Sequence, residues 1–429
     1  MTTPPVSGPP IFGRRRLLFA RWLFLTLAVV GTTAFADQVL YGDSMRAWQS
    51  LLVNFLFFAG LAQAGVVLSA LLQVTSARWG RPLKRLSEAT VAFLPVAALL
   101  LIVLLSGTAT WAPWVHEPIP EKTPWLNVTF FVTRQLVSFG LLSLLSVLFV
   151  YRSLRPDIGM LVEAGEQPAS RVTRWLIAGW KGSVKERSRS QEAQTRLAPV
   201  LLIAYGWVFT LVAFDLVMAL EPHWFSTLMG AYYFVGNVFI GVAFVTVVGV
   251  WAKDRLGLQD YIGPQQMHDI GKLLFGFSIL WAYMVWSQYL VIWYGDLPEE
   301  TTFVYHRMHG MWAPVTWTVV VLAFALPFTV LLSRSVKTQP GGLTRIAVVV
   351  LTGMWLERFL LVSPSLWHGE GLPLGIFEIM VAAGTLGLFG LCYTTFLVTF
   401  PVLPLSDPRL TTITEHWLPE PGSHDETLA

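Results

Sequence analysis

The stretch AFDLVMALEPHWFSTLMGAYYFVGN, residues 213–237, joins two apolar runs through a short polar turn. Asp215 lies within the first apolar run, whereas Glu221 and His223 flank the proline of the turn. Two apolar runs separated in this way are typical of two helices that cross a membrane in succession. We therefore predict the end of one span, a turn on the outer surface and the start of the next span, with Asp215 alone inside the membrane.

The composition identifies the class of protein. Of the 429 residues, 54% are hydrophobic and 13% are charged, whereas soluble proteins are usually about a quarter charged. Cys392 is the single cysteine, which excludes a CxxCH haem attachment, a cysteine-ligated iron–sulfur cluster, a thiolate zinc site and a disulfide framework. The chain is predicted to be an all-α polytopic membrane protein that binds no metal and no redox cofactor itself.

Ten segments are apolar over the roughly 20 residues that are needed to cross about 30 Å of hydrocarbon. We place these predicted spans near residues 17–36, 51–73, 90–107, 128–150, 198–220, 228–251, 271–294, 311–332, 343–362 and 374–400. The first is interpreted as an uncleaved span, because a small-residue cleavage site is missing there. Residues 1–400 are therefore predicted to form a single integral membrane domain.

The positive charges indicate the orientation of these spans. With a cytoplasmic N-terminus, all but five of the 29 Lys and Arg residues fall on inner segments, as the positive-inside rule requires. The five exceptions are Arg46, Lys122, Arg134, Arg307 and Arg358. An odd number of spans would destroy this alternation, so both termini are predicted to be cytoplasmic.

Two segments outside the spans have distinct compositions. Residues 151–197 are predicted to form a cytoplasmic loop, in which SRVTRWLIAGWKG (170–182) interleaves basic and aromatic residues like a helix that lies on the membrane surface. A specific partner site is the alternative to such an interfacial anchor. Residues 401–429 are predicted to be a polar, Pro-rich cytoplasmic tail that is extended or disordered.

A pattern of acid, proline and tryptophan occurs twice. Asp215 is followed seven residues later by Pro222, Glu357 is followed seven residues later by Pro364, and a tryptophan follows each proline. Each proline lies about two helical turns beyond its acid on the same face, where it would expose backbone carbonyls to water. This repeat indicates two related four-helix bundles, formed by spans two to five and six to nine, with spans one and ten as flanking helices.

Ionisable groups inside a membrane are candidate functional residues, because burying them there is costly. The predicted members are Asp215, Glu357, Arg358 and Glu378. A carboxylic acid in low-dielectric surroundings has a raised pKa and can exchange protons near neutrality. The alternative is a structural ion pair, which the adjacent Glu357 and Arg358 would form poorly, because neighbouring side chains on a helix point about 100° apart.

Residues at the ends of the spans add further candidates for a proton path. Glu221 and His223 lie on the predicted outer side, and His268, Asp269 and Lys272 open the seventh span on the inner side. The inner group would serve as a proton entrance. The alternative is a capped helix start in which the lysine extends to the membrane surface.

The sequence patterns that could indicate a metal, haem or quinone site are weaker than the pattern of ionisable residues. His306 and His309 have the i, i+3 spacing of a shared metal site, but without a third ligand at helical spacing surface histidines are favoured. The spans lack the mid-membrane histidines that haem b would need. Aromatic residues within 271–294 would suit a quinone ring, and an aromatic belt at the membrane interface is the alternative.

Three segments carry a family resemblance. FDLVMALEPHWFSTLMGAYYFVGN (214–237), HDIGKLLFGFSILWAYMVWSQYLVIWYGDLPEET (268–301) and GWKGSVKERSRSQEAQTRLAP (179–199) resemble ActF, a membrane component of alternative complex III. ActF belongs to the wider family of polysulfide-reductase and NrfD-like integral membrane subunits. The resemblance is strong over residues 170–310, and the ten-span layout matches nearly the whole chain.

The resemblance implies a subunit of a bacterial quinol:cytochrome c oxidoreductase in the cytoplasmic (inner) membrane. The implied partners are a quinol-site membrane subunit, an iron–sulfur subunit and haem c subunits, so that haems and clusters belong to other chains. The implied role is proton translocation coupled to quinol oxidation elsewhere in the complex. Such subunits are also labelled quinone-binding, so quinone or quinol is the one ligand the chain itself would take.

The resemblance supports the candidate residues unequally. Those of the opening stretch match the family's FD…EPHW segment, and the group that opens span seven matches its HDIGK segment. Glu357, Arg358 and Glu378 match no family motif and rest on their predicted depth. Three roles therefore stay open: a proton path, a quinone-binding subunit, and a structural scaffold without chemistry of its own. A stand-alone transporter is the remaining alternative.

Overall fold

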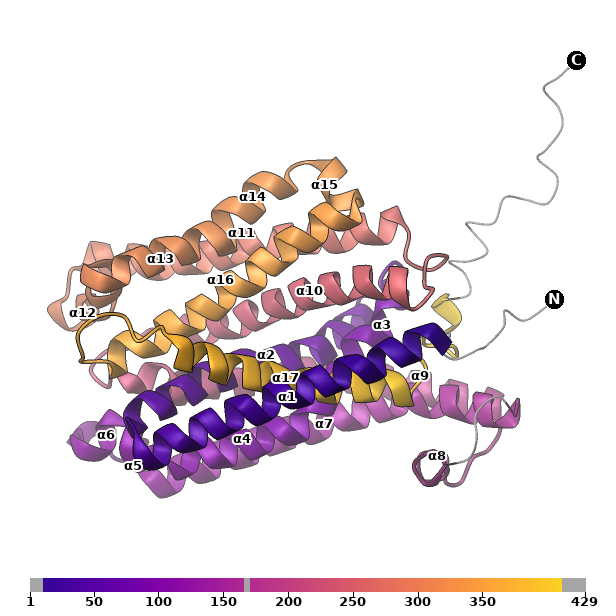
Figure 1. Cartoon of the computed structure of the whole chain (residues 1–429), viewed down its shortest axis with the longest axis horizontal. Coiled ribbons are helices and arrows are strands. Elements are labelled where there is room, and N and C mark those ends of the chain that lie inside the picture. Colours follow the sequence, from indigo (N-terminus) through magenta and orange to yellow (C-terminus); the bar gives the residue numbers. More distant parts are fainter. Residues whose placement is uncertain (1–10, 166–169, 411–429) are drawn as a thin grey trace, which may run out of the picture.

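The computed structural model describes residues 11–165 and 170–410. Within these residues the regular secondary structure is entirely helical, and ten helices are long and apolar enough to cross a membrane, which confirms the predicted number. These long helices lie side by side along the long axis of the molecule (Figure 1). The chain is therefore an all-helical, multi-pass membrane protein.

The spans are built as follows. The first five are α1 (Ile11–Tyr41), α2 (Ser44–Val74), the run α3 (Arg81–Glu88), η1 (Ala89–Phe93) and α4 (Leu94–Ser106), then α7 (Val128–Glu163) and α9 (Ser183–Leu216). The last five are α10 (Met229–Arg255), α11 (Pro264–Gly295), the run α13 (Ala313–Val320), η5 (Val321–Ala325) and α14 (Leu326–Leu331), then α16 (Pro340–Leu366) and α17 (Ile376–Thr399). The short connecting elements are α5 (Thr108–Trp111), α6 (Pro113–His116), η2 (Pro120–Lys122), α8 (Arg171–Leu176), η3 (Met218–Leu220), α12 (Pro298–Met308), η4 (Gly310–Trp312) and α15 (Arg334–Thr338).

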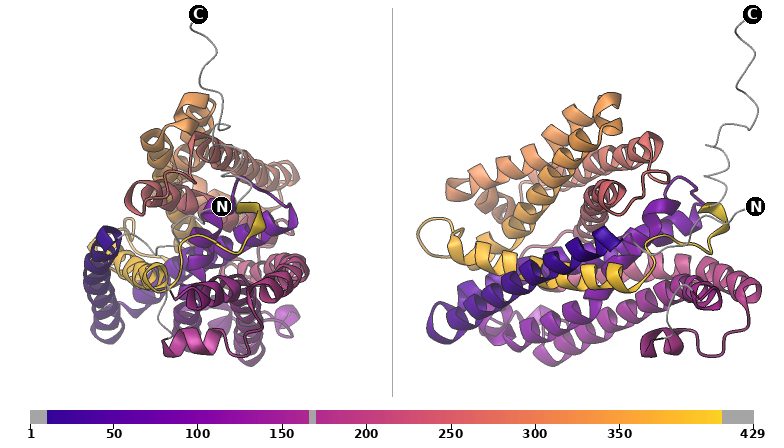
Figure 2. Two further views of the ribbon diagram at one scale, coloured as in Figure 1. Left: turned by 90° about the vertical axis from the view of Figure 1, so that its right-hand side faces the viewer. Right: turned by 45° about the vertical axis from the view of Figure 1, so that its right-hand side comes forward.

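The long helices form two four-helix bundles, as the sequence predicts. Bundle one contains α2, α4, α7 and α9, and bundle two contains α10, α11, the α13–α14 run and α16. Helices α1 and α17 pack against each other at one side of both bundles (Figure 2). Gly31 and Gly384 allow this close approach, because a Cβ atom on Gly31 would lie 2.3 Å from the Gly384 Cα. Small residues at such contacts are typical of helix pairs in membranes.

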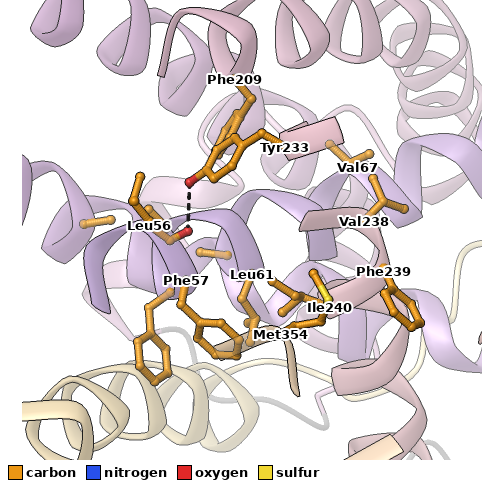
Figure 3. Packing of buried hydrophobic residues seen from close by; sticks show 14 of the residues in the cluster. Leu56, Phe57, Leu61, Val67, Phe209, Tyr233, Val238, Phe239, Ile240 and Met354 are labelled. Atoms are coloured by element: carbon orange, nitrogen blue, oxygen red, sulfur yellow. Dashed lines mark hydrogen bonds between the residues drawn. The ribbon is translucent and has the colours of Figure 1, made fainter. Parts of the chain in front are cut away.

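Helix α2 lies at the seam between the bundles and is the most buried span. It packs against α9 of its own bundle and against α10 and α16 of the other. In the close-up of this packing, Leu56 and Leu61 of α2 lie near Tyr233 of α10 and Met354 of α16 (Figure 3). The Tyr233 hydroxyl donates a hydrogen bond of 3.1 Å to the Leu56 carbonyl oxygen. A helix that is apolar over most of its surface is expected in such a central position.

The segments outside the predicted spans are more ordered than the sequence suggests. Helices α7 and α9 extend far into residues 151–197, and the surface helix is reduced to the six residues of α8, where Trp175 is exposed. Residues 401–410 are packed against the bundles, with Val402, Ser406, Asp407 and Leu410 buried. The rest of the predicted tail, residues 411–429, lies outside the described residues.

Candidate functional site

The molecule has two chemically different ends (Figure 1). Elements α6 and α12 lie at one end, and α8 and α15 lie at the other. We name the first the histidine end, because it carries His116, His223, His306, His309 and His368. We name the second the basic end, because most of the Lys and Arg residues lie there.

Glu357 is the centre of a polar cluster inside bundle two. Its carboxylate accepts hydrogen bonds from the Tyr232 hydroxyl of α10 and from Arg358 Nη1, the latter at 2.5 Å. Arg358 Nη2 in turn donates to Asn237 Oδ1 at 2.9 Å. We call these four residues the Glu357 cluster, and all of them are buried.

The expectation that adjacent Glu357 and Arg358 pair poorly is wrong. Their Cβ atoms diverge on the helix, but both side chains are long and turn toward α10, where Asn237 and the ring of Tyr233 hold the guanidinium. The Arg358 Cζ lies 4.3 Å from the centroid of that ring. Contacts with α10 therefore bring the side chains of Glu357 and Arg358 together although the two residues are adjacent in the helix.

Asp215 is held by a dense set of donors in bundle one. Arg134 of α7 binds it with two hydrogen bonds, from Nε at 2.8 Å and from Nη2 at 2.9 Å. Trp125 Nε1 donates at 3.0 Å, and Gln135 Nε2 also donates to the carboxylate. A fully buried carboxylate with bidentate Arg pairing is a strong structural ion pair. The arrangement fits the structural alternative better than a proton relay.

The two prolines of the sequence repeat are not equivalent. Pro364 lies inside α16, whereas Pro222 follows η3 in a turn outside any helix. In a regular helix the backbone nitrogen of residue 364 would donate to the Leu360 carbonyl oxygen, but the nitrogen of Pro364 cannot donate. Arg307 of α12 donates to this oxygen instead, from Nε at 3.1 Å. The expectation that this carbonyl is exposed to water is therefore wrong.

Arg307 connects several parts of the histidine end. It is buried, pairs with Glu221 at 2.9 Å and donates to the Ser365 hydroxyl at 2.7 Å. Ser365 also donates to Glu221, at 2.7 Å. Glu221 is half-buried and pairs with the buried Arg307, which is a more specific role than the interfacial position that the sequence predicts.

Glu378 lies at the start of α17 and has a structural geometry. It forms two hydrogen bonds with Arg46 of α2, at 2.6 and 2.8 Å. It also accepts from the Gly375 backbone nitrogen at 2.8 Å and so caps the helix. Glu378 is not in contact with the Glu357 cluster.

A pocket of about 810 Å³ opens at the histidine end. It lies where α9, α12 and α16 end or begin, so that both halves of the sequence repeat meet in its wall. Its polar lining residues are Glu221, His223, Glu299, Thr302, Tyr305, His306, His309, Ser365 and His368, and its aromatic walls are Trp224, Trp312 and Trp367. Among the described residues no group of three or more His, Cys, Asp or Glu could hold a metal ion. Consistent with surface histidines, the His309 Nδ1 lies 3.1 Å from the Tyr305 carbonyl oxygen.

The candidates that open the seventh span lie at the basic end, away from the Glu357 cluster. Asp269 pairs with Lys272 at 2.6 Å, and His268 lies beside them in the first turns of α11. Gln266 caps the helix by accepting from the Gly263 nitrogen at 3.0 Å. The structure therefore brings these three residues together with one another but not with Glu357.

The sequence reasoning missed five buried polar side chains spread along α2 on several of its faces, where they bond to α16, α7 and α3; we call them the α2 ladder. Its members and their partners are Gln49 with Ser363, Asn54 with Trp355, Gln63 with Ser146, Ser69 with Glu88, and Gln73 with Arg81. The 24 residue steps from the first to the last correspond to about 36 Å of helix. This length exceeds the roughly 30 Å of a membrane's hydrocarbon layer. The signal that was available is a recurrence of Gln, Asn and Ser in an otherwise apolar run.

The sequence reasoning also missed a cluster of buried charges at the basic end. Arg81, Lys84, Arg85 and Glu88 of α3 meet Asp157 of α7 and Asp407 of the C-terminal segment, and all six are buried. We call them the charge cluster. The ion pairs are Arg81–Asp407 at 3.0 Å, Lys84–Asp407 at 3.5 Å, Lys84–Glu88 at 3.9 Å, Arg85–Glu88 at 2.6 Å and Arg85–Asp157. From the sequence alone, the three basic residues of the cluster indicate only the orientation of the spans.

Asp407 binds this cluster as a carboxylate. Burial raises the pKa of its carboxyl group, but the charges of Lys84 and Arg81 outweigh burial and hold the pKa below its usual range. A lowered pKa means that the attachment is complete above the ordinary carboxyl range, near pH 4. It weakens only as the pH falls through the lowered value.

Comparison with known proteins gives one informative similarity. The chain matches no family model. It is 21% identical to the C subunit of selenate reductase from Mesobacillus selenatarsenatis over 429 aligned positions, which cover 93% of this chain and 96% of that protein. The similarity therefore extends over most of the length of both chains and not over a single motif.

Proposed function

We propose that this chain is the membrane-embedded subunit of a bacterial respiratory oxidoreductase of the alternative complex III type, in the cytoplasmic membrane. The full-length similarity to a component of selenate reductase supports a place in a multi-subunit oxidoreductase. The segments that resemble ActF of alternative complex III point to the finer assignment. In this proposal the haem and iron–sulfur subunits are partner chains, and the electrons pass through them.

The proposed contribution of this chain is a path for protons. The observation that carries the proposal is the α2 ladder, a set of buried hydrogen-bonding groups distributed over a length of α2 that exceeds the hydrocarbon thickness of a membrane. Ionisable residues inside a membrane protein are expensive and mark ion and proton pathways. The α2 ladder reaches two of them, because Ser69 bonds to Glu88 and Gln73 bonds to Arg81.

The Glu357 cluster is the proposed proton-exchange point on this path. Glu357 accepts from a tyrosine hydroxyl, and Asn237 of the same cluster has a buried Nδ2 without a hydrogen-bond partner among the described residues. Gln63 of the α2 ladder has a buried Nε2 in the same situation. Buried polar groups of this kind are typical places for ordered water, and water chains carry protons. Asp215, which is fully paired with Arg134, is assigned a structural role.

The test is the ratio of protons released to electrons transferred in the purified complex. We expect Glu357→Gln to lower this ratio at least about twofold while electron transfer and subunit composition stay unchanged, because an amide cannot take up a proton at this step. Tyr232→Phe tests the same step while keeping the charge pair, and it is expected to lower the ratio too.

Glu370→Gln is the matched control, since Glu370 is an exposed carboxylate at the same end of the molecule. An unchanged ratio in both cluster variants would refute the proton path. It would leave a scaffold role as the better account.

Quinone binding is the second candidate function, and the pocket at the histidine end favours it. Its volume of about 810 Å³ lies within the usual range for small-molecule sites, and tryptophan and histidine side chains form its walls. A photoreactive quinone analogue that labels residues of this wall would support the candidate. Labelling confined to a partner membrane subunit would exclude it.

A further inference from the structure

The segment 401–410 lies across the basic end of bundle one, and we call it the strap. It follows α17 and is mostly without helical structure, yet several of its side chains are buried. The chain can be followed in yellow beyond the end of α17 (Figure 2). A non-helical segment is buried at a bundle end only when specific contacts hold it there.

Polar contacts of this kind attach the strap to both α3 and α7. Asp407 pairs with Arg81 at 3.0 Å and with Lys84 at 3.5 Å. The backbone nitrogen of Ser406 donates to Asp157 Oδ1 at 2.7 Å. The strap therefore joins α3 to α7 at the point where the charge cluster would otherwise face the surface.

The charge cluster under the strap continues into the α2 ladder. Glu88 is fully buried and accepts hydrogen bonds from Ser69 of the ladder at 2.8 Å and from Ser153 at 2.9 Å. A small cavity of about 10 Å³, close to the size of one water molecule, lies between the strap and α9. Lys84 and Ser153 line the wall of this cavity that faces the helices, and Ser406 lines the wall that the strap forms.

Lys84 is placed to release the strap. Its ammonium group lies 3.5 Å from Asp407 and 3.9 Å from Glu88, and it donates to Gln194 at 2.7 Å. When Asp407 moves away, Lys84 retains Glu88 as its counter-charge and is not left buried without a partner. Lys84 therefore keeps a counter-charge in the lifted state, which it shares with Arg85, and Arg81 keeps its hydrogen bonds to Gln73 and to two backbone carbonyl oxygens.

We propose that the strap is a lid over a water entrance to the α2 ladder, and that Glu88 is the acid reached when the strap lifts. This inference rests on the proposed function, since it assigns an entrance to the proton path. It places that entrance in bundle one, at the charge cluster, and not at His268 and Asp269 of bundle two. A local segment can open while the rest of the fold stays intact.

The test is the reactivity of a cysteine placed under the strap in the purified complex. Ser153→Cys is a near-isosteric change next to Glu88, and Cys392→Ala removes the single natural thiol. The probe is a small charged methanethiosulfonate reagent, which reaches only thiols that water reaches. We expect slow reaction with the intact strap and reaction at least about tenfold faster with Asp407→Asn, which removes the ionic attachment.

Two further variants sharpen the test. Ser406→Pro removes the backbone donor to Asp157 while it keeps every charge, and it is also expected to accelerate the reaction. Glu192→Gln neutralises an exposed acid on α9 and is expected to change nothing. Unchanged rates in both strap variants, or fast reaction with the intact strap, would overturn the inference. Because labelling does not depend on proton movement, failure of the proton-release test would leave this result interpretable.

Discussion

Arg307→Ala is expected to destabilise the chain by about 3–5 kcal/mol, the usual cost of breaking a buried ion pair. The guanidinium pairs with Glu221 and donates to the carbonyl oxygens of Leu360 and Leu361 at 3.1 and 3.0 Å. The Leu360 carbonyl would have no other donor, because Pro364 cannot supply one. The free energy of unfolding, or the thermal midpoint of the purified complex, measures the effect.

Arg345→Ala is the matched control for this prediction. Arg345 is exposed on the same chain segment as Leu360, α16, and has one hydrogen bond, to the Gly341 carbonyl oxygen at 3.1 Å. Its replacement is expected to cost less than about 1 kcal/mol. Equal effects of the two substitutions would contradict the role given to Arg307.

Arg134→Met is the second substitution with a large expected effect. It leaves the fully buried Asp215 carboxylate without its cation, which we expect to cost about 3–5 kcal/mol. The double variant with Asp215→Leu removes the unpaired charge and is expected to recover much of that loss, so that the two effects are not additive. Thermal unfolding of the single and double variants measures the interaction free energy between Arg134 and Asp215.

The double variant also distinguishes a structural role of Asp215 from a role in proton transfer. If Asp215 has only a structural role, the double variant keeps the ratio of protons to electrons of the unmodified complex. Arg196→Met, which breaks the exposed pair with Glu192, is the control and should change stability by less than about 1 kcal/mol. A lowered proton ratio in a folded double variant would return Asp215 to the proton path.

The sequence predicts the ten spans because their number depends on hydrophobicity and charge alone. Apolar runs of the right length set the number of helices. The repeat of acid, proline and tryptophan indicates the division into bundles, although its two prolines have different structural roles. Side-chain detail is not needed for either inference.

The buried polar groups could not be found in the same way. Ser69 and Gln63 lower the hydropathy of α2 only slightly, and nothing in a single sequence shows that Glu88 and Ser146 face them. Likewise, Arg81 satisfies the positive-inside rule equally well on the surface or in the interior. Its partner Asp407 lies 326 residues away in the chain, in a segment that looks like a solvated tail.

Local spacing also misled one inference about the candidate site. A rule about directions on a helix predicts that Glu357 and Arg358 do not pair. Long side chains in a confined space turn toward whichever helix offers donors and acceptors, and here that helix is α10. Pairing inside a bundle therefore depends on neighbouring helices and not on sequence spacing.

The most direct test of the central claim is a redox-difference infrared spectrum of the purified complex. If Glu357 exchanges protons during turnover, adding quinol changes the carbonyl band of a protonated carboxylic acid. We predict that this band disappears in Glu357→Gln and persists in Asp215→Asn. A band of unchanged size in Glu357→Gln would contradict the assignment of Glu357 as the proton-exchange point.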